Sequence, residues 1–180
     1  MNIRKLLRNL LCGTGLAMLI LPLSALAQEA PKAEVFAGYS YLRTFGDGES
    51  LNSHGFNGSI AGNINKHFGI VGDFGFHRAS VLDVGINTFT YMAGPRISGR
   101  SDKVDPFVHA LFGGARLSVP DASFSDTAFA FAFGGGLDIK ASDSVAFRIA
   151  QVDYIGFRQE GVTDNNFRYS VGIVFRIGGK

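Results

Sequence analysis

The stretch Phe56-Asn-Gly-Ser-Ile-Ala-Gly-Asn-Ile-Asn65 decides the fold, because its residue types change with a period of two. The even positions hold Phe, Ile and Gly, whereas the odd positions hold Ser, Ala and three asparagines. Alternate side chains of a β-strand lie on opposite faces, so the pattern predicts a strand with one apolar and one polar face. Three asparagines would line an apolar ligand pocket poorly, which argues against a soluble ligand-binding barrel.

The C-terminal run 165–177 repeats this alternation. Its odd positions from Phe167 to Ile177 are all aromatic or β-branched, and its even positions include Arg168 and Arg176. The runs around Asp73 and Asp138 likewise place charge on the face that carries small residues. We therefore expect an apolar outer surface around a polar interior.

Eight such runs follow one another, separated by connections that alternate between short polar turns and longer segments. The runs are 34–44, 54–65, 68–78, 87–98, 105–117, 127–139, 144–158 and 165–177. This order is typical of an up-and-down barrel with its longer loops at one end and both termini at the other. Open sheet edges do not occur in hydrocarbon, so the strands must close on one another. The predicted fold is an all-β, eight-stranded antiparallel transmembrane β-barrel.

Two runs are less regular. Within 144–158 the phase slips between Ile149 and Val152, which predicts a β-bulge. In 105–117, apolar residues compete for both faces, so the sequence leaves the facing of this strand open.

The first 27 residues have the pattern of a cleaved signal peptide. Three cations precede an apolar run from Leu10 to Leu23, and Ala25-Leu26-Ala27 supplies the small residues that signal peptidase requires. The alternative is a transmembrane anchor, but a spanning helix needs about 20 apolar residues. We predict a helical signal peptide over 1–27 and a barrel domain over 28–180.

Removing this segment changes the charge balance. The remaining chain has 14 Lys and Arg against 15 Asp and Glu, which argues against a nucleic-acid partner. The only cysteine, Cys12, is removed with the segment, so no disulfide can stabilise an exported barrel.

Eight charged residues fall on predicted inner faces and form a candidate lumen network. They are Glu34, Asp73, Arg96, Asp138, Arg148, Asp153, Arg168 and Arg176. Hairpin registers predict the pairs Asp138 with Arg148 and Asp153 with Arg168, and closure of the barrel places Glu34 beside Arg176. An eight-stranded barrel is just wide enough for its interior to be filled by side chains, so this network predicts a plugged lumen.

No catalytic residue, cofactor or metal site is predicted. The histidines after the signal segment form no helical metal motif; they are His54, His67, His77 and His109. A catalytic role for His77 or His109 with Asp73 stays an alternative to a hydrogen-bonded structural role. The Gly113-Gly114 and Gly134-Gly-Gly136 sequences precede no helix and do not predict phosphate binding.

Several segments together resemble the OmpA/OmpX-like family of small outer-membrane β-barrel proteins. They are Glu34-Val-Phe-Ala-Gly-Tyr-Ser-Tyr41, Ile60-Ala-Gly-Asn-Ile-Asn65, Gly94-Pro-Arg96, Gly134-Gly-Gly-Leu-Asp138, Arg148 to Tyr154, and Arg168-Tyr-Ser-Val-Gly-Ile-Val-Phe175. The resemblance implies a monomer in the lipid of the bacterial outer membrane.

The resemblance also implies assembly by the outer-membrane insertion machinery through the C-terminal strand. The expected recognition stripe is Tyr169, Ile173, Phe175 and Ile177. The family commonly ends in an aromatic residue, whereas here Phe175 precedes Arg176-Ile-Gly-Gly-Lys180.

The predicted function is that of a structural or anchoring barrel that supports envelope integrity or surface interaction through short extracellular loops. A narrow channel for small solutes and a lipid-modifying barrel enzyme remain as alternatives.

We expect signal peptidase to cut the chain before Gln28. N-terminal sequencing of protein from the membrane fraction should begin at Gln28, because Ala25 and Ala27 occupy the positions read by the peptidase. A membrane-bound chain that still carries Leu16 to Leu23 would contradict cleavage and favour an inner-membrane anchor.

Overall fold

A computed structural model describes residues 30–45, 50–81, 84–119, 124–159 and 162–178. The predicted signal peptide 1–27 and its cleavage site lie outside the described residues. Among the described residues, no helix is long and apolar enough to cross a membrane.

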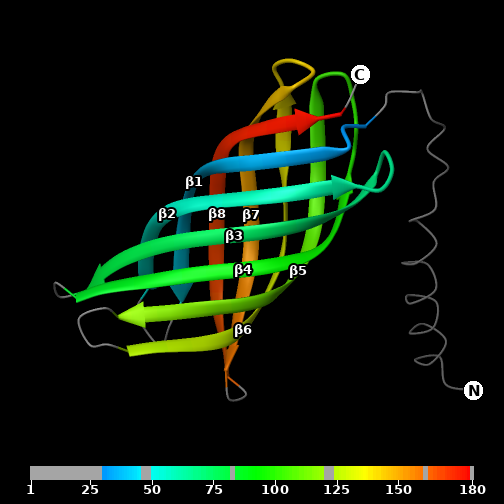
Figure 1. The fold of residues 1–180 in the computed structure, drawn as a ribbon. Coiled ribbons are helices and arrows are strands. Elements are labelled where there is room, and N and C mark those ends of the chain that lie inside the picture. Colours follow the sequence, from blue (N-terminus) through cyan, green and yellow to red (C-terminus); the bar gives the residue numbers. More distant parts are fainter. Residues whose placement is uncertain (1–29, 46–49, 82–83, 120–123, 160–161, 179–180) are drawn as a thin grey trace, which may run out of the picture.

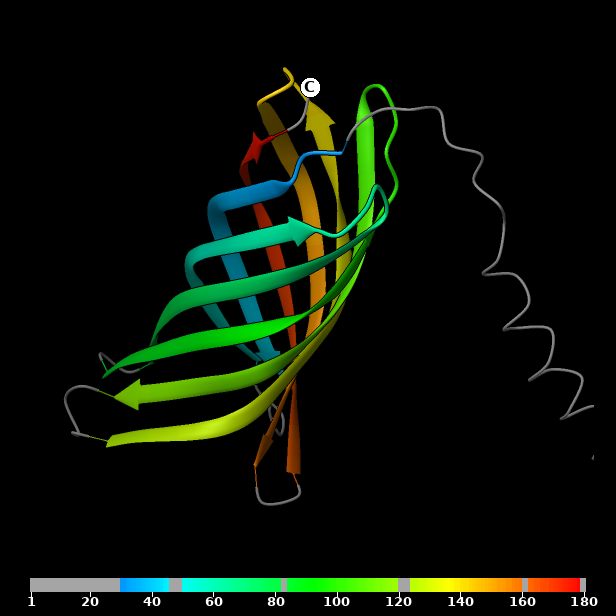
Figure 2. The same cartoon turned by 45° about the vertical axis from the view of Figure 1, so that its right-hand side comes forward.

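Eight antiparallel strands form one closed barrel (Figure 1). The strands are β1 (Ala33–Phe45), β2 (Ser50–Asn63), β3 (Phe68–Val81), β4 (Val84–Ser98), β5 (Val104–Val119), β6 (Phe124–Lys140), β7 (Val145–Gln159) and β8 (Val162–Ile177). Each strand pairs with the next along the chain, and β1 closes on β8 from Ala33 opposite Ile177 to Phe45 opposite Asn165. Figure 2 shows the strands curving around this closed wall. The predicted eight-stranded antiparallel barrel is confirmed.

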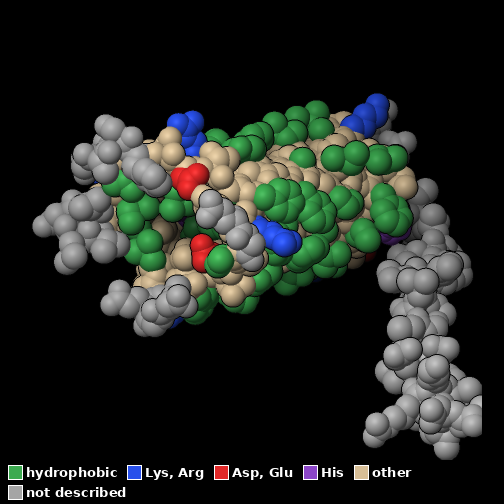
Figure 3. Space-filling model, turned by 90° about the horizontal axis from the view of Figure 1, so that it is seen from below, with side chains coloured by type: hydrophobic (Ala, Val, Ile, Leu, Met, Phe, Trp, Pro, Cys, Tyr) green, Lys and Arg blue, Asp and Glu red, His purple; other side chains and the backbone are tan. Residues whose placement is uncertain are grey.

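The alternation of side chains is confirmed as well. In β2, Phe56 is 71% exposed whereas the adjacent Asn57 is 2% exposed, and the same alternation runs along β8. Hydrophobic side chains lie in patches along the visible barrel wall (Figure 3). The barrel is thus apolar outside and polar over much of its interior, the reverse of a soluble domain.

The structure settles the facing of β5. Phe107 is 4% exposed and lies in the interior, whereas Val108 is 57% exposed. The Phe107 ring packs against two guanidinium groups, with Arg96 Cζ at 4.2 Å and Arg148 Cζ at 4.3 Å from its centroid. These cation–π contacts from other strands give Phe107 a reason to face inward that its own strand does not reveal.

The predicted bulge lies in β7. Arg148 is opposite Gly172 and Gln151 is opposite Ser170, so β7 advances three residues while β8 advances two. The extra residue reverses the facing of everything after it, and Arg148 and Gln151 therefore both point inward.

The predicted contrast between long and short connections is wrong. The strands extend further than the runs suggested, and the segments between them at one end are only 46–49, 82–83, 120–123 and 160–161, which lie outside the described residues. The turns at the other end, next to the chain termini, are 64–67, 99–103 and 141–144. Polar residues continue the strands because cross-strand pairing satisfies their backbone groups. We call these two ends of the barrel the loop end and the turn end.

A charge introduced on the outward face should destabilise the barrel more in the middle of the membrane than at the loop end. Ile60→Lys should lower the free energy of unfolding by about 2 to 4 kcal/mol, because Ile60 points outward in the middle part of β2, where lipid is expected. Ser50→Lys, at the exposed loop end of the same strand, should cost only about 0 to 1 kcal/mol. Urea unfolding of the barrel in lipid vesicles measures both values, and equal costs would contradict a lipid-facing wall.

Candidate functional site: the charged lumen

Two clusters of charged and polar side chains occupy the barrel interior. The turn-end cluster consists of Glu34, Arg96, Arg100, Asp105, Asp138, Arg148 and Arg176. The central cluster consists of Asn57, Asp73, His109, Asp153 and Arg168. All eight residues that the sequence placed on inner faces are buried, and each belongs to one of the two clusters.

In the turn-end cluster, Glu34 contacts arginines from other strands and turns. Its carboxylate lies 3.0 Å from Arg96 Nη1 and accepts a hydrogen bond from Arg100 Nη1 at 2.6 Å. Arg176 is opposite Glu34 in the β1–β8 register, but their nearest charged atoms are 3.9 Å apart. The short contact of Arg176 is instead with Asp105 Oδ2, at 2.5 Å.

Arg148 of β7 and Asp138 of β6 form a bidentate ion pair. Arg148 Nε donates to Asp138 Oδ1 at 2.8 Å and Nη2 donates to Oδ2 at 3.0 Å. The guanidinium also lies over the rings of Phe36 and Phe107, at 4.2 and 4.3 Å from their centroids. Paired hydrogen bonds and contacts with two aromatic rings hold this cation in one position.

Arg168 is the centre of the second cluster and is completely buried. Its Nη1 donates to Asp73 Oδ1 at 2.7 Å, and its Nη2 donates to Asp153 Oδ2 at 2.8 Å. His109 Nε2 lies 2.7 Å from the other oxygen of Asp153. One cation thus bridges carboxylates from β3 and β7.

Gln151 joins the two clusters. Its Oε1 accepts a hydrogen bond from Arg148 Nη1 at 2.7 Å, and its Nε2 donates to Asp153 Oδ2 at 2.8 Å. The β7 bulge makes this link possible, because without the extra residue Gln151 would point outward.

Sequence reasoning did not include several members of the network. Asp105 was missed because the facing of β5 was open, and Arg100 because it lies in a turn. Burial lowers the pKa of Arg100, but hydrogen bonds and charge from Glu34 and Asp105 outweigh burial, so its pKa is raised above the ordinary value. Asp105 lies five residues after Arg100 in the sequence, and this proximity is the signal that could have identified their contact.

An apolar layer lies between the central cluster and the loop end. It includes Leu42, Met92, Leu111, Ile155 and Phe157, all buried and packed with small residues of neighbouring strands. Beyond this layer, the mouth of the barrel is a cup whose lining includes Asp126 and Asp164. From the turn end to the loop end, the lumen thus contains the two clusters, then the apolar layer, then the cup.

The interior also holds one serine–histidine contact. Ser40 Oγ lies 2.9 Å from His77 Nε2 and 2.9 Å from Ser170 Oγ, and all three residues are buried. Within the described part of the chain, no carboxylate hydrogen-bonds to the other ring nitrogen of His77. The described residues also contain no group of three or more His, Cys, Asp or Glu side chains that could hold a metal ion.

A closed β-barrel with an apolar wall and a charged interior defines the class of membrane-spanning β-barrels. The family model for the outer membrane protein beta-barrel domain matches residues 14–175. The chain belongs to this family, whose members are bacterial outer-membrane proteins.

Solved structures show the same fold. Neisserial surface protein A has a TM-score of 0.71 at 13% identity, with 81% of this chain and 97% of that chain covered. Ail of Yersinia pestis has a TM-score of 0.54 at 21% identity, with 81% and 99% covered. OprG of Pseudomonas aeruginosa has a TM-score of 0.55 at 9% identity, with 84% and 98% covered. Comparison with curated protein sequences found no significant match.

Removing Arg148 tests the energetic role of the turn-end cluster. Arg148→Met should lower the free energy of unfolding by about 3 to 5 kcal/mol, because Asp138 would keep only its 3.4 Å contact with Arg96. Adding Asp138→Asn to the same protein should recover part of that loss, since the unpaired charge is removed. Chemical unfolding of both variants provides the measurement, and a double variant less stable than the single one would contradict this account.

Proposed function

We propose that this protein is a structural, non-enzymatic barrel of the outer membrane whose lumen is plugged. The observation that carries the proposal is the buried network that spans the interior, from Glu34 in the turn-end cluster to Arg168 in the central cluster. The apolar layer beyond it adds a second barrier of different chemistry.

The network favours a plug because its members are tied to one another across the lumen. Arg168 contacts both Asp73 and Asp153, and Arg96 contacts both Glu34 and Asp138. Passage of a solute would separate several pairs at once and leave buried charges unpaired, which is costly at each one. A rigid, closed barrel of this kind suits an anchor or an envelope support better than a conduit.

The partners of such a barrel follow from its surfaces. The outward face meets outer-membrane lipid along every strand, and the insertion machinery recognises the outward stripe of β8 that includes Tyr169 and Phe175. The chain reaches this membrane after removal of its signal peptide, functions as a monomer, and binds no nucleic acid.

Surface adhesion is a less favoured form of the same function. One structure of Ail, the attachment invasion locus protein of Yersinia pestis, is a complex with the heparin analogue sucrose octasulfate. Here the connections at the loop end comprise only two to four residues each, which leaves a small area for a macromolecular partner. We therefore assign envelope support ahead of surface binding.

An enzymatic function is also less favoured. The Ser40–His77 contact has the two groups that a nucleophile and its base require. Both side chains are buried in the middle of the barrel, however, where an acyl chain or peptide would have to displace the packed interior to reach them.

Electrical recording tests the plug directly. Purified protein in planar lipid bilayers should show at most rare, small conductance steps, because buried ion pairs join strands across the interior. Replacing the Asp138 and Arg148 pair by alanines removes one charged constriction without leaving an unpaired partner between them, and should make steps more frequent. Large, steady conductance of the unmodified protein would overturn the plug and make the narrow channel the better function.

A further inference from the structure

The cup at the loop end of the barrel is large enough for a small ligand. Its volume is about 210 Å³. Ala128 and Phe157 lie at its inner end, where Phe157 belongs to the apolar layer and Ala128 packs against that layer. An apolar cavity of about 150 Å³ can hold one benzene ring. The cup therefore has room for one ring or a short alkyl chain, but not for a folded partner.

Acidic side chains lie on one side of the cup. They are Asp126 of β6 and Asp164 of β8, and Asp126 accepts a hydrogen bond from Gln159 on the strand between them. Each acid is directly opposite an apolar residue of the lining. Asp126 is opposite Leu117 in the β5–β6 pairing, and Asp164 is opposite Phe157 in the β7–β8 pairing. Directly opposed side chains are close neighbours, so a cation bound at either carboxylate also lies beside apolar surface.

Apolar side chains face these acids across the cup. Leu51 of β2 and Ile86 of β4 belong to the lining. Strands four places apart lie on opposite sides of a ring of eight, so β2 is across from β6 and β4 is across from β8. The cup thus presents carboxylates on one side and hydrocarbon on the other. This arrangement suits a ligand that has a cationic group on an apolar body.

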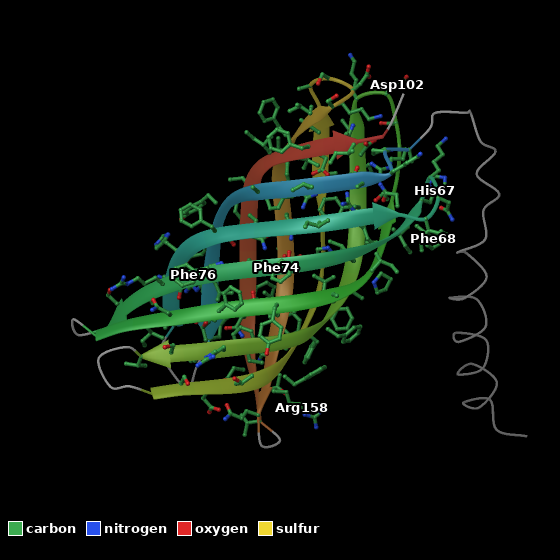
Figure 4. The ribbon with its side chains drawn as sticks, viewed as in Figure 1. His67, Phe68, Phe74, Phe76, Asp102 and Arg158 are labelled. Atoms are coloured by element: carbon green, nitrogen blue, oxygen red, sulfur yellow. The ribbon has the colours of Figure 1, made fainter. Side chains whose placement is uncertain are left out.

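No basic side chain of the described lining neutralises the two acids. The described lining contains no lysine, arginine or histidine, and neither acid forms an ion pair with a residue that the structure describes. The arginines at this end are exposed and occupy outward positions of their strands; they are Arg43, Arg78, Arg116 and Arg158. Figure 4 labels Arg158 at that end of β7. Positive charge is thus placed on the outer wall and negative charge inside the cup.

The connections at the loop end add acids and no cation. Their sequences are Gly46-Asp-Gly-Glu49, Leu82-Asp83, Pro120-Asp-Ala-Ser123 and Glu160-Gly161. Together they contain five Asp and Glu residues and no Lys, Arg or His. Because none of these segments has a basic side chain, none can form an ion pair with Asp126 or Asp164. Carboxylates gathered at the mouth of a narrow barrel attract cations from solution.

We propose that the cup binds a small organic ammonium ion whose apolar body is about one ring in size. The ammonium group lies on the acidic side, beside Asp126 and Asp164, and the ring packs against Phe157, Leu51 and Ile86. The acids exclude anions. The apolar walls favour such a ligand over a hydrated metal ion, which gains nothing from contact with hydrocarbon. The site ends at the apolar layer and does not depend on whether the ion pairs deeper in the barrel plug the lumen.

Two substitutions separate the charged and apolar contributions. Asp164→Asn removes one carboxylate with little change in volume, and Asp143→Asn, in a turn at the other end of the barrel, is its matched control. Ala128→Leu fills the inner end of the cup. Ala93→Leu, on the exposed outward face of β4, is the matched control for volume.

NMR titration of the isotope-labelled barrel in zwitterionic lipid nanodiscs with 2-phenylethylamine measures the site. Amide signals of cup residues should shift to saturation, whereas those of the turn end should not move. 2-Phenylethanol lacks the charge and should bind about fivefold more weakly or less. Ethylamine lacks the ring and should bind about tenfold more weakly or less. Asp164→Asn should weaken binding of the amine about threefold or more and Ala128→Leu about tenfold, whereas both controls should match the unmodified protein.

Several outcomes would overturn the site. Equal affinity for 2-phenylethanol would show that charge does not select the ligand, and equal losses in Asp164→Asn and Asp143→Asn would indicate diffuse attraction. Unchanged binding to Ala128→Leu would exclude the cup, and tighter binding of a trilysine peptide would assign it to a protein side chain. Heat-dependent gel migration identifies a variant that has lost its fold, in which case the comparison of ligands on the unmodified protein decides. Steady conductance of the unmodified barrel would refute the plug without affecting this titration.

Discussion

Closure of β1 on β8 is the constraint on which the rest of this structure depends. In hydrocarbon no water can satisfy the backbone groups of an edge strand, so the sheet must pair with itself. With eight strands, closure leaves an interior only wide enough for side chains. The narrow lumen then determines what its residues can be, because each buried charge needs a partner within a few ångströms. The dense ionic network thus follows from the number of strands and from the hydrocarbon that surrounds the barrel.

Small residues and charges share the inner face for the same reason. Ala130 and Ala132 on β6 leave space that longer side chains from other strands fill, and Leu111 and Ile155 belong to the same buried apolar cluster. Toward the turn end the space is taken by guanidinium groups, which stack on Phe36 and Phe107. Arginine suits this position because its planar group can bind a carboxylate in its plane and contact aromatic rings with its faces.

The bulge in β7 shows how a local irregularity supports the whole interior. One extra residue brings both Arg148 and Gln151 to the inner face, and Gln151 then connects the two charged clusters. A regular strand would have placed that amide toward lipid, where its hydrogen bonds could not be made. The one extra residue in β7 causes both the change of phase in the sequence and the link between the two clusters.

Features of the fold that depend on residues close together in the sequence could be predicted, whereas contacts between distant segments could not. Alternation with a period of two predicted the strand number, the apolar wall and the bulge, because each depends on neighbouring residues of one strand. The antiparallel order was inferred from the connections, and it is correct although the expected difference in their lengths is not present. Hairpin register is nearly as local, and it relates Asp138 to Arg148 and Asp153 to Arg168 across adjacent strands. The facing of Phe107, the contact of Arg176 with Asp105 and the bridge from Arg168 to Asp73 could not be predicted in this way. Both ion pairs join strands that are not neighbours, and Phe107 of β5 likewise contacts Arg148 of β7. The curvature of the closed sheet brings these side chains together across the lumen.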